Sequence, residues 1–263
     1  SLLRVSYPPD KPGACPASEY RAWSAFVTSP HPAADPGAQP RLSVVVPTYN
    51  ERERLSEFVE TVLATLARAG VPAEIVIVDD NSPDGTGALA DELAARHPVT
   101  VVHRAGKLGL GSAVVAGFGV ARGAILGVMD ADMSHPPEYL PRLIEAFDRT
   151  GSDIVVGSRY VPGGGTKNWP WYRAFMSRFA CRLASVVTPV RDAASGFFLI
   201  RASVLRGGEV QAPGFKICLE LLVRGTYASV AEVPYVFADR AAHEDAVPTE
   251  AQKRRFTLLY PRE

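Results

Sequence analysis

The chain has 263 residues, of which 47% are hydrophobic and 21% are charged, so it can bury a sizeable core in one large domain or two small ones. Lysine and arginine total 28 residues, and aspartate and glutamate also total 28. This balance creates no overall field that favours a polyanion, and it argues against nucleic acid as the main partner.

The cysteine pattern and the apolar runs bear on location. The three cysteines, at positions 15, 181 and 218, form no CxxC pair, so neither a structural zinc site nor a disulfide framework is expected. No run approaches the roughly 18 consecutive apolar residues that span a bilayer, and the first residues lack the layout of a signal peptide. We therefore expect a cytoplasmic protein that meets any lipid partner from the membrane surface.

Strand and helix patterns alternate through most of the chain. Residues 1–40 are rich in proline and alanine and predict a loose arm or a wrap over the surface. Beyond them, strands are predicted at 42–46, 74–78, 99–103, 124–129 and 154–156, and helices at 51–69, 86–96, 111–121 and 138–150. This alternation indicates an α/β fold, a doubly wound and mostly parallel sheet with helices on both faces.

The regularity weakens after about residue 160. Three consecutive glycines at 163–165 predict a mobile loop, and residues 169–187 predict a helix of aromatic, basic and apolar side chains. Strands are expected at 197–200 and 231–237, and a short surface helix is expected at 248–263.

Two acidic clusters each follow an apolar strand. Asp79 and Asp80 come after residues 75–78, and Asp130 and Asp132 come after residues 125–129. Open α/β sheets bind ligands outside the carboxyl ends of their strands. In extended backbone, residues i and i+2 point the same way, so Asp130 and Asp132 can face one cation. Mg²⁺ and Mn²⁺ suit carboxylate ligands and often share them with a diphosphate.

Each acidic cluster also has a structural interpretation. Asp132 can instead cap the turn formed by residues 133–136, and the first cluster can serve turn chemistry in residues 80–85. In the functional interpretation, Asp79 or Asp80 holds a base or a ribose by hydrogen bonds. The sequence leaves both alternatives open at each cluster.

Several segments together resemble the family 2 glycosyltransferases of GT-A fold, and within them the polyprenol- and dolichol-phosphate mannose synthases. They are VVPTYNE (45–51), VDDNSPDGT (78–86), GKLGLG (106–111), MDADMSHPPE (129–138), GSRY (157–160), SGF (195–197) and GFKI (214–217) with Glu220. The resemblance covers roughly residues 42–240. It implies a nucleotide-sugar donor, usually GDP-mannose, a divalent metal and inversion at the anomeric carbon. It divides the chain into a Pro-rich arm (1–40), a GT-A catalytic domain (41–240), and a variable acceptor loop with a tail (241–263).

The resemblance assigns the donor side as follows. Asp130 and Asp132 would bind Mg²⁺ or Mn²⁺ and the sugar diphosphate, with Asp132 and Lys107 in catalytic roles. The remaining donor-binding positions are Pro47, Tyr49, Glu51, Asp79 and Asp80. Each has a plain alternative: a strand end for Pro47, a core aromatic for Tyr49, a helix first turn for Glu51 and a solvated loop for Lys107.

The acceptor side is basic. Arg159, Arg173 and Arg240 occupy positions that meet the acceptor phosphate in the family, with Ser177 as a helper and Arg159 as a catalytic residue. A guanidinium binds phosphate by two parallel hydrogen bonds. A phosphate oxygen is anionic near neutral pH, with a second pKa of about 6, so it needs no general base. The aromatic residues around Arg173 can rest on a membrane interface or form the buried face of a helix.

One segment departs from the family. The family usually has Gly-x-Ser-Lys shortly after the position of Arg240, whereas residues 243–246 here read His-Glu-Asp-Ala. Two acids there would repel a phosphate. The sequence therefore predicts a polyprenyl-phosphate mannosyltransferase, with a soluble enzyme acting on a small-molecule acceptor as the alternative. A catalytically silent nucleotide-sugar binder is disfavoured because both acidic clusters are present.

Overall fold

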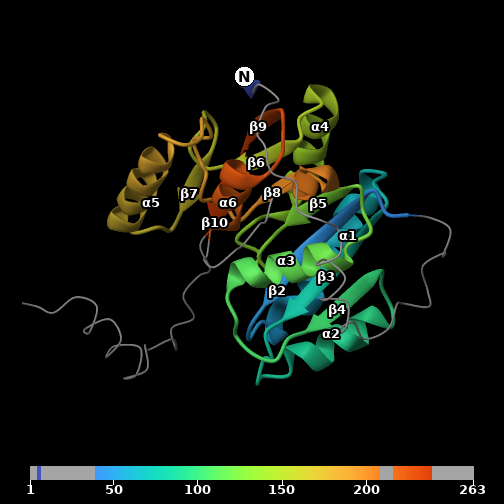
Figure 1. Cartoon of the computed structure of the whole chain (residues 1–263). Coiled ribbons are helices and arrows are strands. Elements are labelled where there is room, and N and C mark those ends of the chain that lie inside the picture. Colours follow the sequence, from blue (N-terminus) through green and yellow to red (C-terminus); the bar gives the residue numbers. More distant parts are fainter. Residues whose placement is uncertain (1–4, 7–38, 208–215, 239–263) are drawn as a thin grey trace, which may run out of the picture.

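A computed structural model describes residues 5–6, 39–207 and 216–238 of the chain. Its main sheet has the strand order β1-β9-β6-β8-β5-β2-β3-β4 (Figure 1). All strands run parallel except β1 and β8, which pair antiparallel to their neighbours. The strands are β1 (Val5–Ser6), β2 (Leu42–Thr48), β3 (Ala73–Asp79), β4 (Val99–His103), β5 (Ile125–Val128), β6 (Ile154–Ser158), β8 (Phe198–Arg201) and β9 (Ser229–Pro234).

Helices cover both faces of this sheet, which confirms the predicted fold class. Three of them pack on one face: α1 (Arg52–Arg68), α2 (Thr86–Ala94) and α4 (Leu140–Thr150). Two pack on the other: α3 (Leu110–Val120) and α6 (Ile217–Arg224). Short 3-10 turns lie at Pro137–Tyr139 and Ala202–Gly207. Each face buries its own hydrophobic core, as the two-layer packing of an amphipathic sheet requires.

Side-chain spacing explains how the helices dock. In α1, Leu55, Phe58, Val59, Val62 and Leu66 recur at helical spacing, and all five are buried against the sheet. In α3 a glycine allows the helix to approach β2, because a Cβ at Gly117 would come within 2.4 Å of Val45 Cγ1.

The strand order predicts the position of a ligand crevice. The chain passes from β2 to β3 and β4 on one side and then crosses to β5 on the other side of β2. This reversal is a topological switch point, where open sheets bind ligands outside the carboxyl ends of their strands. The two acidic clusters follow β3 and β5, so both lie at this edge.

Two predictions after residue 160 were only partly right. Gly163 and Gly164 lie in a turn, but Gly165 begins β7 (Gly165–Lys167), which pairs in parallel with β10 (Val236–Ala238). The single strand predicted at 231–237 is also two strands, since the chain leaves the main sheet at Pro234 and enters the small one. Proline has no N–H with which to continue a ladder, which explains the break.

The helices predicted after residue 160 had different outcomes. The predicted helix at 169–187 is confirmed as α5 (Trp171–Ala184), which lies beside β7 and β10 at one side of the molecule (Figure 1). Helix α6 was not predicted. The helix expected at 248–263 lies outside the described residues, and the three-part division of the chain stays a prediction. In the described part of the chain, every helix is too short or too polar to cross a bilayer.

Candidate active site

The acidic pair lies in a tight turn directly after β5. Asp130 N–H donates to His135 Nδ1 at 3.1 Å, and Asp132 Oδ1 accepts the N–H of Ser134 at 2.9 Å. Arg54, on α1, donates to the carbonyl oxygen of Asp132 at 3.4 Å. Asp132 thus makes the turn contact that the structural interpretation expected. This contact uses only one of its two carboxylate oxygens.

The charges of the pair fit a divalent cation. Burial and the negative charge of Asp132, opposed by the charge of Arg159, together raise the pKa of Asp130 to about 7. A cation between the two carboxylates would remove this repulsion. Within the described residues, no three acidic, histidine or cysteine side chains gather as a metal site. Water and diphosphate oxygens would therefore complete the coordination, as Mg²⁺ and Mn²⁺ allow.

His135 supports the turn as a neutral imidazole. It is buried and stacks on Phe197 at a centroid distance of 5.3 Å, with Tyr235 and Phe237 also against it. Burial lowers its pKa to about 4. Because Nδ1 accepts the N–H of Asp130, the ring proton belongs on Nε2.

The first acidic cluster is largely engaged within the protein. Asp79 accepts hydrogen bonds from Thr48 Oγ1 at 3.2 Å and from the N–H of Ser82 at 3.0 Å, which is the turn chemistry considered above. Asp80 forms a buried ion pair with Arg104 at 3.0 Å. Burial raises the pKa of Asp80 even though Arg104 lowers it. Contact of either aspartate with a donor stays a prediction.

Arg104 is a site residue that the sequence analysis missed. Besides pairing with Asp80, its guanidinium donates to Ser112 Oγ at 2.7 Å and to the carbonyl oxygen of Gly109 at 3.3 Å. It therefore ties the end of β3 to the loop that carries Lys107. Its position one residue after β4 was the available signal, since polar residues at that strand edge border the crevice.

The other predicted donor residues lie along the same edge. The ammonium of Lys107 sits 4.3 Å from the ring centroid of Tyr49, and both side chains are exposed. Glu51 comes just before α1, and its N–H donates to Thr86 Oγ1 at 3.0 Å. Pro47 pairs with Val78 near the end of β2. The structure thus brings Lys107 and Tyr49 together, and their role in donor binding stays a prediction.

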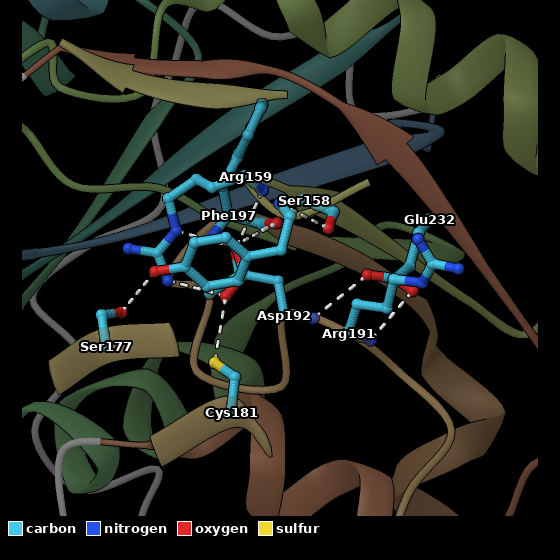
Figure 2. Close-up of polar contacts among 10 residues, drawn as sticks. Ser158, Arg159, Ser177, Cys181, Arg191, Asp192, Phe197 and Glu232 are labelled. Carbon is cyan, nitrogen blue, oxygen red and sulfur yellow. Dashed lines mark hydrogen bonds and ion pairs between the residues drawn. The ribbon is translucent and has the colours of Figure 1, made fainter. Parts of the chain in front are cut away.

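Arg159 follows β6 and is held by Asp192. Figure 2 shows the two side chains facing each other, with Nε and Nη2 of Arg159 donating to the two carboxylate oxygens at 2.7 Å each. The arginine side chain is only 7% exposed. Burial works to lower its pKa, but the hydrogen bonds and charge of Asp192 outweigh burial and raise it above its ordinary value.

The other residues predicted to bind the acceptor lie on or near α5, and their contact with an acceptor stays a prediction. Arg173 stacks over the Trp169 ring at 4.3 Å, and Ser177 Oγ accepts the Tyr160 hydroxyl at 2.6 Å. Arg240 and residues 243–246 lie outside the described residues. Ala238 donates its N–H to the carbonyl oxygen of Ser134, so the end of β10 is fixed to the Asp132 turn.

Helix α5 turns its apolar side chains outward. Its one fully buried residue is Cys181. It carries three arginines and no acidic residue. The exposed apolar set comprises Trp171, Tyr172, Phe175, Met176, Phe179 and Leu183, and Trp171 is 81% exposed. The prediction left open whether this face is buried, and the structure shows that it is not.

Three titratable side chains, Asp192, His135 and Glu220, already make contacts within the protein. Asp192 binds Arg159, and His135 is a buried neutral imidazole. Glu220 forms an ion pair with Arg224 at 3.0 Å within α6. Each of these contacts competes with a role in removing a proton from an acceptor hydroxyl.

The doubly wound sheet, with an acidic pair at its switch point, defines a GT-A glycosyltransferase. The chain belongs to the family described as Glycosyl transferase family 2, whose profile matches residues 43–208. The chain is 47% identical over 208 residues to a dolichol-phosphate mannosyltransferase from Pyrococcus furiosus, a match that covers 78% of this chain and 58% of that protein.

Two further comparisons agree. The chain is 43% identical to a polyprenol monophosphomannose synthase from Mycolicibacterium smegmatis, over 76% of this chain and 78% of that protein. A solved mannosyltransferase from Pyrobaculum calidifontis, in complex with GDP-Man and Mn²⁺, shares the fold with a TM-score of 0.54 and 20% identity. That likeness covers 87% of this chain and 64% of the other.

Proposed function

We propose that the protein transfers mannose from GDP-mannose to a polyprenyl phosphate, with inversion at the anomeric carbon. The relatives from Pyrococcus and Mycolicibacterium are named for dolichol-phosphate and polyprenol mannosyl transfer. The solved mannosyltransferase of the same fold holds GDP-Man and Mn²⁺. These names support the donor, the metal and the class of acceptor for this chain.

One observation carries the proposal: a buried guanidinium lies near the acidic pair, since Phe237 packs against both Arg159 and His135, and His135 accepts the N–H of Asp130. Arg159 is close enough for its charge to lower the pKa of Asp130. A nucleotide-sugar diphosphate is attracted to a cation at Asp130 and Asp132, and an acceptor phosphate is attracted to Arg159. Two anionic substrates can therefore bind side by side, each at its own positive charge.

On the donor side, Asp130 and Asp132 would hold Mg²⁺ or Mn²⁺. When bound, the cation neutralises the charge that grows on the departing diphosphate. Lys107 is long and exposed, and it would bind a diphosphate oxygen from the opposite side of the crevice. Tyr49, which lies under Lys107, would help to place it. Asp132 would also orient the sugar with its second carboxylate oxygen, which does not take part in the hydrogen bond to Ser134.

On the acceptor side, a phosphate oxygen would attack the anomeric carbon directly. It is already anionic near neutral pH, so no proton has to be removed. This agrees with the engagement of Asp192, Glu220 and His135 in other contacts. Attack from the face opposite the diphosphate inverts the configuration.

The lipid chain of the acceptor would meet helix α5. An exposed face with Trp171, Phe175 and Phe179, flanked by arginines and free of acidic residues, is the composition of a helix that rests in a membrane interface. We propose that the protein works at the cytoplasmic face of a membrane, with α5 in contact with lipid. The buried thiols of Cys181 and Cys218 fit a reducing compartment.

The test is incubation of the full chain with labelled GDP-mannose, Mn²⁺ and undecaprenyl phosphate in mixed vesicles. We expect label in the organic phase, none with chelator, and none when undecaprenol replaces the phosphate. A parallel series with UDP-glucose checks the donor. Label that appears only on water-soluble alcohols would reject the lipid-phosphate acceptor and favour the small-molecule alternative raised by residues 243–246.

A further inference from the structure

Asp192 grips Arg159 along one edge of its guanidinium. Oδ2 accepts Nε–H at 2.7 Å and the Arg159 backbone N–H at 2.9 Å, while Oδ1 accepts Nη2–H at 2.7 Å (Figure 2). A guanidinium is a planar fork with five N–H donors. The edge formed by Nη1 and the second hydrogen of Nη2 lies outside this pair. One edge is therefore fixed by the protein, and another edge presents donors to a second anion.

The ion pair between Arg159 and Asp192 is buried in the protein before any ligand binds. Asp192 is fully buried and Arg159 almost so. A lone buried cation would be strongly destabilising, and the carboxylate compensates for its lost hydration. The rings of Tyr160 and Trp169 lie 5.3 Å from the guanidinium carbon and limit its rotation. Hydrogen bonds in such a dry setting are stronger than in water.

Asp192 is itself fixed from the sheet. The N–H groups of Arg191 and Asp192 donate to the two carboxylate oxygens of Glu232 at 3.0 and 3.1 Å (Figure 2). Glu232 is buried on β9, opposite Val156 of β6. Cys181 of α5 contacts Asp192 Oδ1 at 3.7 Å from another side. The orientation of the Arg159 fork is therefore set by two neighbouring strands and not by a loop alone.

We propose that Asp192, held by Glu232, is a positioning residue that aims the Nη1 edge of Arg159 at the phosphate of the acceptor. The identity of that phosphate rests on the proposed function. Asp192 itself touches no substrate and acts through Arg159. Such pre-organisation lowers the entropic cost of binding, because the fork does not have to be ordered by the ligand.

The test measures binding without turnover. Farnesyl phosphate, a short and water-soluble polyprenyl phosphate, is titrated into the full chain by calorimetry in the presence of GDP and Mn²⁺. For Asp192→Asn we expect the Kd for farnesyl phosphate to rise at least about tenfold, because the amide turns one N–H₂ group toward the guanidinium and displaces the fork. The Kd for GDP should change less than about twofold, because Asp192 lies on the acceptor side.

Glu74→Gln is the matched control. Glu74 is also a buried carboxylate that accepts an arginine side chain, Arg122 Nε at 2.8 Å, and a backbone N–H at 2.8 Å. It lies at the opposite end of the sheet, near the start of β3. We expect this variant to lose stability while it binds farnesyl phosphate like the parent.

A double-mutant cycle separates positioning from a merely structural role. If Asp192 acts through Arg159, adding Asp192→Asn to Arg159→Ala should change the Kd for farnesyl phosphate less than about twofold. Full additivity of the two effects would overturn the proposal. So would an unchanged Kd in Asp192→Asn, or a parent chain that binds no farnesyl phosphate.

Two further outcomes are distinguishable. If Asp192→Asn does not fold, Glu232→Gln replaces it, with an expected rise of about three- to fivefold in the Kd, since one of two anchoring acceptors is kept; no rise would overturn the proposal. If the parent binds farnesyl phosphate with the expected dependence on Asp192 but transfers no mannose, the proposed function fails and the positioning role stands.

Discussion

The proposed donor side and the proposed acceptor side of the site differ in the side chains that they expose. Around β2, β3 and β5, polar side chains are engaged within the protein: Asp79 in a turn, Asp80 with Arg104, and Asp132 with the N–H of Ser134. Around α5, large apolar side chains face outward. A rigid polar rim suits a water-soluble nucleotide, and an exposed apolar helix suits an amphipathic acceptor. The contrast predicts that the two sides can be disabled separately.

The largest expected effect comes from the acidic pair. Asp130→Asn with Asp132→Asn should reduce mannosyl transfer about a thousandfold or more, since the charge on the leaving diphosphate is no longer balanced. Association with vesicles should not change. At pH 8 without metal the variant should melt no lower than the parent, because the raised pKa of Asp130 means that its charged form disfavours the folded state. Parent-like transfer in this variant would refute the donor-side assignment.

The reciprocal change removes the apolar face of α5. Trp171→Gln, Phe175→Gln and Phe179→Gln together should weaken binding to lipid vesicles about thirtyfold, from the loss of roughly 2 kcal/mol of apolar burial. Transfer to farnesyl phosphate should stay within about threefold of the parent, because this short, water-soluble acceptor reaches the site without binding of the protein to a membrane.

Vesicle flotation measures this effect, and Val223→Gln, on the exposed part of α6, serves as the control. If the triple variant floats with vesicles like the parent, α5 is not the membrane contact. The proposed role of the apolar face in acceptor binding then fails.

A smaller effect is expected from Arg104, which ties the loop that carries Lys107 to the end of β3. Arg104→Gln leaves Asp80 buried without its cation, and we expect the free energy of unfolding to fall by about 3 kcal/mol. GDP should bind about tenfold more weakly, because the loop with Lys107 loses its tie to β3. Thermal melting and calorimetry measure the two effects. Arg104→Lys keeps the charge and should recover part of the stability and part of the GDP affinity. If neither substitution changes the GDP affinity, the loop with Lys107 does not need Arg104 as an anchor.

The smallest effect concerns the stacking of Lys107 on Tyr49. Tyr49→Leu should weaken GDP-mannose binding about threefold, because an exposed cation–π contact contributes about 0.5–1 kcal/mol. Tyr49→Phe keeps the ring and should bind like the parent. If both variants bind GDP-mannose equally weakly, the hydroxyl of Tyr49 and not its ring face contributes to binding.

Much of the sheet could be predicted from the sequence because its strands are buried on both sides. Runs such as residues 75–78 are apolar and largely β-branched, and such runs gave strand positions within a residue or two. The acidic pair could be found for the same reason, since the end of each strand marks the ligand edge. The local sequence pattern was therefore sufficient to predict the buried strands and the acidic residues at their ends.

Long-range contacts were beyond that approach. The pairing of β7 with β10 joins residues about seventy positions apart, and nothing in the glycine segment indicates it. Arg104 was missed because its partner, Asp80, follows a different strand, β3, and lies 24 positions earlier in the sequence. Arg159 was expected as a phosphate ligand, but its tight hold by Asp192 depends on a loop that only the fold brings near. Such pairs depend on topology and not on sequence spacing.

The pairing of β10 has a practical consequence for engineering. Its three residues are locked to β7 on one side, and Ala238 is tied to Ser134 on the other. A chimera that keeps residues 39–238 and exchanges the sequence after Ala238 for that of a relative therefore has a stable splice point. Such hybrids would show how far acceptor choice can be transplanted independently of nucleotide choice.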